Sequence, residues 1–191
     1  SAGKVALDYT WLGAEHICAG PDHLLFVVGL LLLVGWNRRL IYTVTAFTLG
    51  HSVTLAMVTF GLFDYPVSLV EFMIALSIFV LAVELARGSA GALWRQPWWL
   101  AGGFGLLHGM GFAGALADTG LPQSNVPLAL LFFNVGIELG QLAFIALLAL
   151  LAAIGRRLIG ERVGALRPLP VYVLGGFSAM WCIERGLEVL A

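Results

Sequence analysis

The chain has 191 residues, of which 60% are hydrophobic and 11% are charged, and its formal net charge at pH 7 is −1. Soluble domains are usually about 45–50% apolar and about 25% charged, so this composition excludes an ordinary soluble fold. The balanced charge, without a block of basic residues, also argues against a nucleic-acid partner. We therefore expect an all-α integral membrane protein that forms a single transmembrane domain over residues 1–191, with the lipid bilayer as its main partner.

The N-terminal part begins with Ser1 and not with methionine, which indicates either a removed signal peptide or a cloning remnant. We expect residues 1–20 to form an external segment, with a short amphipathic piece along the outer surface. The first span is predicted over residues 21–36. Pro21 suits the first turn of a helix, and Asp22 beside it favours the positive end of the helix dipole.

Five further stretches supply the roughly 20 apolar residues that a membrane-spanning helix needs. They cover residues 40–62, 66–86, 98–117, 126–154 and 170–190. The sequence thus predicts a bundle of about six transmembrane helices. Arginines follow the first, third and fifth spans, whereas the loops 63–65 and 118–127 contain no basic residue. The positive-inside rule therefore predicts that both termini lie outside.

Three ionisable residues fall near the middle of the predicted membrane when depth is counted at about 1.5 Å per helical residue. They are His51, His108 and Glu138, from three different spans. Ionisable groups at this depth are costly, so we expect the three to face one another in one shared site. Asn134 and Gln141 lie on the same helical stripe as Glu138. We expect them to orient its carboxylate.

A second group of polar residues lies in or near the outer half of the predicted bundle. His16, Asp22 and His23 combine imidazole with carboxylate, the ligand types that suit nickel, cobalt, zinc, copper or iron. Further candidates for a pathway or a supporting role are Ser52, Glu71 and Glu184. The structural alternative for such residues is a hydrogen bond between helices or a solvated helix end. Because polar groups become rare in the inner half, we expect a polar cavity that opens outward.

These motifs resemble those of the HupE/UreJ family of bacterial membrane proteins. The matching segments are His16-x5-Asp22-His23, Thr48-x2-His51-Ser52, residues 104–109 and residues 133–142. The resemblance implies a nickel permease, or an accessory of hydrogenase or urease maturation, with a cleavable signal peptide. In a bacterial inner membrane, the termini that the positive-inside rule puts outside would be periplasmic. The histidine motif of better-studied members continues into a glutamate, whereas residues 111–115 here contain no acid. We therefore expect a divalent transition metal, either nickel or alternatively zinc, cobalt, copper or iron.

Three functions fit this pattern. The first is a permease, in which the metal passes from Asp22 and His23 to the three residues at mid-depth. The second is a membrane-embedded, zinc-type hydrolase, in which three ligands leave an open position that activates water. The third is a sensor or accessory protein that does not transport. A permease needs an inner path or a moving gate. Only Glu84 lies clearly near the inner end of a span, and rocking helices could supply the gate.

Overall fold

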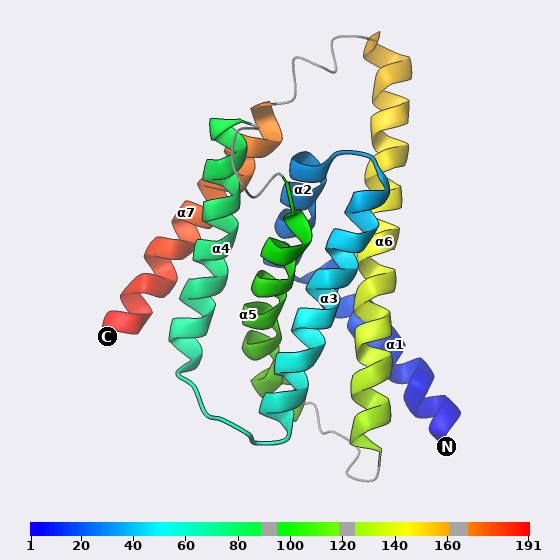
Figure 1. The fold of residues 1–191 in the computed structure, drawn as a ribbon, viewed down its shortest axis with the longest axis vertical. Helices are drawn as coiled ribbons and strands as arrows, with labels where there is room; N and C mark the ends of the chain where they lie inside the picture. The colour runs from blue at the N-terminus through cyan, green and yellow to red at the C-terminus, as the bar shows by residue number, and fades with distance from the viewer. Residues whose placement is uncertain (89–94, 119–124, 161–167) are drawn as a thin grey trace.

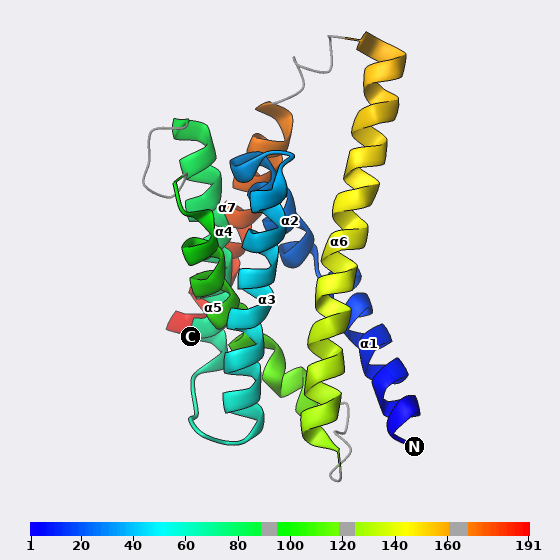
Figure 2. The same ribbon diagram turned by 45° about the vertical axis from the view of Figure 1, so that its right-hand side comes forward.

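The computed structural model describes residues 1–88, 95–118, 125–160 and 168–191, and within these residues the regular structure is helical. The helices are α1 (Ala2–Ala19), α2 (Pro21–Val34), α3 (Arg38–Thr59), α4 (Val67–Arg87), α5 (Pro97–Asp118), α6 (Val126–Ile159) and α7 (Pro168–Leu190). From α3 to α7, successive helices run in alternating directions through one bundle (Figures 1 and 2). The all-helical expectation is confirmed.

The first two helices follow each other directly but are not collinear, because the chain bends by 76° between α1 and α2. The break lies at Gly20, and Pro21 then occupies the first helical position, where its missing N–H costs nothing. α1 crosses α6 obliquely and packs against it (Figure 1). A Cβ atom at Gly13 or Gly136 would overlap a main-chain carbonyl of the other helix. α1 is therefore packed onto the bundle through α6, and its place along the outer membrane surface stays a prediction.

Three of the described helices, α3, α4 and α6, are long and apolar enough to cross a membrane. The bent pair of α1 and α2 is a fourth candidate if the two helices together count as one span. Helices α5 and α7 have 22 and 23 residues and lie beside these helices in the same bundle. The protein is thus a multi-pass membrane protein, and the number of six spans stays a prediction.

A second close helix pair is α3 with α5. A Cβ atom at Gly105 would overlap the carbonyl oxygen of Phe47, and one at Gly109 would overlap that of His51. The Thr54 hydroxyl also donates to the carbonyl of Leu106 across this contact, at 2.7 Å. The glycines let the backbones touch, as small residues do in membrane helix pairs. This contact fixes the depth of α5 relative to α3.

The arginine-bearing helix ends lie on one side of the bundle. α3 begins there, and α4 and α6 end there (Figure 1). These ends carry Arg38 and Arg39, Arg87, and Arg156 with Arg157. Both termini lie toward the opposite side (Figure 1). This one-sided distribution is what the positive-inside rule uses, so the arginine-bearing side is the inner side in the orientation that the sequence predicts.

Candidate metal site

Four histidines from four helices meet inside the bundle. His16 comes from α1, His23 from α2, His51 from α3 and His108 from α5. The ring centroids of His16 and His23 are 4.5 Å apart, those of His23 and His108 are 5.1 Å apart, and those of His16 and His51 are 6.2 Å apart. We expected His16 and His23 to lie nearer the outer surface of the membrane than His51 and His108. The bend at Gly20 instead brings all four together.

Each of these imidazoles has one buried ring nitrogen without a hydrogen-bond partner. The atoms are Nε2 of His16, His23 and His51, and Nδ1 of His108. One ring nitrogen each of His16, His23 and His51 lies within 4.8 Å of the others, a spacing that suits a shared metal ion. Buried polar atoms are rarely left unpaired, because each costs about 1–3 kcal/mol. Four such nitrogens in one place therefore indicate a ligand that binds imidazole.

The other ring nitrogen of three histidines is held by a neighbouring side chain. Nδ1 of His23 is 3.0 Å from Oδ1 of Asp22, and the main-chain N–H of His23 donates to the same oxygen at 2.9 Å. Nδ1 of His51 is 3.3 Å from Oδ1 of Asn134. Nε2 of His108 is 3.5 Å from the Ser77 hydroxyl, a weak contact. Such partners orient metal-binding imidazoles and leave the free nitrogen facing the site.

Phenylalanines close the inner side of the cluster. Phe26, Phe47 and Phe104 each lie three or four residues from a histidine of their own helix, toward the arginine-bearing side. The ring of Phe26 is 4.9 Å from that of Phe47 and 5.7 Å from that of Phe104. The ring of Phe47 is 5.1 Å from His108. The histidines thus have an apolar floor of three packed rings.

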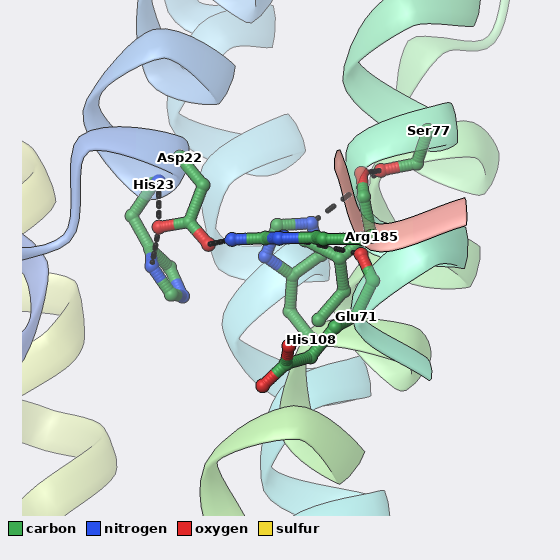
Figure 3. A network of polar contacts seen from close by, with 7 residues as sticks. Asp22, His23, Glu71, Ser77, His108 and Arg185 are labelled. Carbon is green, nitrogen blue, oxygen red and sulfur yellow. Dashed lines mark hydrogen bonds and ion pairs between the residues drawn. The ribbon is translucent and has the colours of Figure 1, made fainter. Parts of the chain in front are cut away.

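A cavity of about 130 Å³ opens on the cluster. Three of the histidines line it together with two acidic residues and one arginine: His16, His23, His108, Asp22, Glu71 and Arg185. Figure 3 shows how these side chains from α2, α4, α5 and α7 converge. Nη2 of Arg185 is 3.9 Å from Oδ2 of Asp22, and its Nη1 donates to the main-chain carbonyl of Glu71 at 3.1 Å.

Glu138 lies in a separate polar seam between α3 and α6. Its two carboxylate oxygens are 2.6 Å from the Thr45 hydroxyl and 2.5 Å from the Thr48 hydroxyl. The Thr48 hydroxyl is also 3.0 Å from Oε1 of Gln141. We expected Glu138 to face His51 and His108, with Asn134 and Gln141 holding its carboxylate. In the structure Asn134 instead contacts His51, and Gln141 contacts Thr48.

The remaining candidates are divided between the cavity and other places. Glu71 lines the cavity. The Ser52 hydroxyl donates to the carbonyl of Thr48 on its own helix, and Glu184 is exposed. Sequence reasoning missed Arg185 and Ser77. An arginine within an apolar span is a signal by itself, whereas a lone serine such as Ser77 gives none.

The fold and this cluster define a multi-pass helical membrane protein with a buried group of histidines that could hold a metal ion. The sequence comparison agrees with this class. The family model described as HupE / UreJ protein matches residues 1–185. The chain therefore belongs to the HupE/UreJ family, whose members are membrane proteins of nickel or cobalt transport or of hydrogenase and urease accessory function. Neither the curated proteins nor the solved structures compared with the chain gave a match.

Proposed function

We propose that this protein is a membrane permease for a divalent transition-metal ion, nickel above all, with zinc, cobalt, copper and iron as the alternatives. His16, His23, His51 and His108 would bind the ion. The observation that carries the proposal is the set of four unpartnered ring nitrogens, one from each of four helices. Neutral imidazole is a ligand for each of these metals. Since protons compete for the same nitrogens, binding should weaken as the pH falls.

The proposed route starts at the cavity, where Asp22 and Glu71 attract the cation before it reaches the histidines. Direct passage inward is closed by the floor of Phe26, Phe47 and Phe104. The α3–α6 seam offers a polar way around this floor. Asn134, which contacts His51, is followed one turn later on α6 by Glu138. In this proposal, Glu138 is the next ligand on the way to the inner side.

Orientation and cellular partners belong to the same proposal. The arginine-bearing helix ends would face the cytoplasm of a bacterium, and both termini would face the periplasm. The cavity would then collect metal from outside. An ion delivered inside could supply a metalloenzyme maturation system.

The main alternative is a membrane hydrolase in which three histidines hold zinc and a fourth position holds water. Sites for organic ligands of drug size usually measure about 300–1,000 Å³. The cavity here measures about 130 Å³, which suits an ion better than a lipid or peptide substrate. This comparison favours the permease over the enzyme.

The proposal is tested with purified protein and with proteoliposomes. We expect bound nickel near one ion per monomer, and nickel uptake into vesicles that His23→Ala abolishes. The control is Ser178→Ala, since Ser178 is buried and its hydroxyl donates to carbonyls of its own helix, α7. Stoichiometric binding without uptake would favour an accessory or sensor. If the protein bound none of the five metals, the proposal would be overturned.

A further inference from the structure

Arg185 places a fixed positive charge at the edge of the cavity. Its firm contacts are to α4 and to its own helix: Nη1 donates to the main-chain carbonyl of Glu71 at 3.1 Å, and Cζ lies 5.7 Å from the centre of the Trp181 ring. The guanidinium lies between Asp22 and Glu71 (Figure 3). Only 21% of the side chain is exposed, so its position is set by the packing of α7 on α4.

The contact between Arg185 and Asp22 is looser than a hydrogen bond. Their nearest atoms are 3.9 Å apart, beyond the usual 2.7–3.2 Å. Oδ1 of Asp22 is taken by His23, whereas Oδ2 faces the guanidinium. The charge of Arg185 therefore offsets that of the Asp22 carboxylate, but no hydrogen bond from Arg185 holds the carboxylate in place. Its outward oxygen can turn to a cation in the cavity without breaking a hydrogen bond to Arg185.

A charge in this place acts against a divalent ion at the histidines. Like charges repel with an energy that grows as the dielectric falls, and His23 and His108, which line the cavity, are buried. Arginine stays charged at any physiological pH, so this repulsion is permanent. A carrier must release its ion as well as bind it, and four imidazoles around one ion would otherwise bind it tightly.

We propose that Arg185 is a resident counter-cation that sets the metal affinity of the site. It balances Asp22 while no metal is present and repels the ion once it is bound, so that the ion leaves on the timescale of transport. This inference rests on the proposed function. Arg185 acts on the ion through space, by repulsion between the two positive charges, and is not a ligand of the ion.

The test compares Arg185→Gln with Arg185→Lys, using nickel(II) and calorimetry on protein in lipid nanodiscs. Glutamine keeps a donor for the Glu71 carbonyl but removes the charge, so we expect nickel to bind about tenfold more tightly or better. Nickel uptake into vesicles should become slower because release is slower. Lysine keeps the charge, and its affinity should stay near that of the wild type. Arg39→Gln, at an exposed arginine of the opposite side, is the matched control.

Two outcomes separate this inference from the proposed function. If the wild type binds nickel and folded Arg185→Gln binds it equally or more weakly, Arg185 only ties α7 to α4 and the inference is wrong. If the wild type itself does not bind nickel or another of the candidate metals, the proposed function fails first. A thermal unfolding measurement on each variant identifies loss of the fold. If Arg185→Gln does not fold, the nickel affinity of Arg185→Lys is compared with that of the wild type to test the inference. A weaker affinity in folded Arg185→Lys at equal stability would also contradict a role of the charge.

Discussion

Asn134 on α6 fixes which nitrogen of His51 is free. The Asn134 side-chain N–H₂ donates to the carbonyl of Leu130 at 2.8 Å, so its oxygen must be the atom that faces His51. That oxygen accepts a hydrogen bond, so Nδ1 of His51 must carry the proton and donate it to the bond. Nε2 of His51 then has a lone pair and no partner. This contact between α3 and α6 thereby leaves one nitrogen of His51 free to act as a ligand in the proposed site.

The first prediction concerns the shared site. We expect His51→Ala and His108→Ala each to reduce nickel affinity by more than the about 10–100-fold that loss of an outer partner costs. The double variant should lose little more than either single variant, because both residues would serve one ion. The measurement is metal per folded monomer, taken together with the melting temperature.

A structural hydrogen-bond network predicts a different result for the same variants. His51→Ala would leave the buried Oδ1 atom of Asn134 without its partner, which lowers stability by about 1–3 kcal/mol in either case. Lost stability with stoichiometric metal in the double variant would therefore contradict the shared site, whereas lost stability with lost metal supports it.

The second prediction concerns Asp22. Asparagine keeps an oxygen that can accept the two hydrogen bonds from His23, so the fold should persist. The negative charge is lost, and the charge of Arg185 is left without its counterpart. We expect nickel affinity to fall about 10–100-fold, measured by calorimetry. Normal binding by Asp22→Asn would mean that Asp22 acts only on the start of α2.

The third prediction uses two glycines of α5. A Cβ at Gly105 would overlap the backbone of α3, whereas no atom lies within 4 Å of one at Gly103. Gly105→Ala should therefore lose about 1–3 kcal/mol through overpacking. Gly103→Ala should be neutral or stabilising, by up to about 1 kcal/mol from helix propensity. Equal melting temperatures for the two variants would contradict the close α3–α5 contact.

The fourth prediction concerns Glu138. Among the described residues, no cationic side chain pairs with its carboxylate. Glu138→Gln retains the shape and the contacts with the two threonines but removes the charge that would receive the ion. We expect nickel binding at the histidines to change little, and uptake into vesicles to fall about tenfold, the effect of ~1.4 kcal/mol on a barrier. A loss of binding equal to that of His51→Ala would instead make Glu138 a ligand of the histidine site.

The fifth prediction is the topology. Single cysteines are introduced at Gly61 or Asp64, and separately at Asn37 or Gly88, after Cys18 and Cys182 have been replaced by serine. The first pair should react with a membrane-impermeant thiol reagent in intact cells, and the second pair only after lysis, since arginine-bearing helix ends stay inside. The reverse labelling pattern would invert the proposed direction of access.

Much of the helical frame could be predicted from local sequence. The six predicted spans begin within two residues of α2 to α7, because apolar runs, Pro21 and the loop arginines act locally. The position of α1 could not be predicted in this way. It depends on the contact of Gly13 and Gly136 with the facing backbones, and a sequence pattern does not show which helices those glycines meet.

The candidate site was predicted in its residues more than in its arrangement. Counting depth placed His51 and His108 at one level, and the structure brings both into the same cluster. Counting gives no rotation of a helix about its axis, however. Asn134 and Glu138 share a stripe on α6, but the crossing with α3 pairs one with His51 and the other with Thr45 and Thr48.

The small volume of the cavity has a consequence for which ions reach the histidines. At about 130 Å³ it is smaller than the usual sites for organic ligands, and the imidazole nitrogens beside it are buried without a partner. A hydrated dication that binds these nitrogens must exchange part of its hydration shell for them. Magnesium gives up water reluctantly and prefers oxygen, whereas nickel and its neighbours regain the lost energy from imidazole nitrogen. Selection would thus begin with dehydration, before the geometry of the ligands is tested.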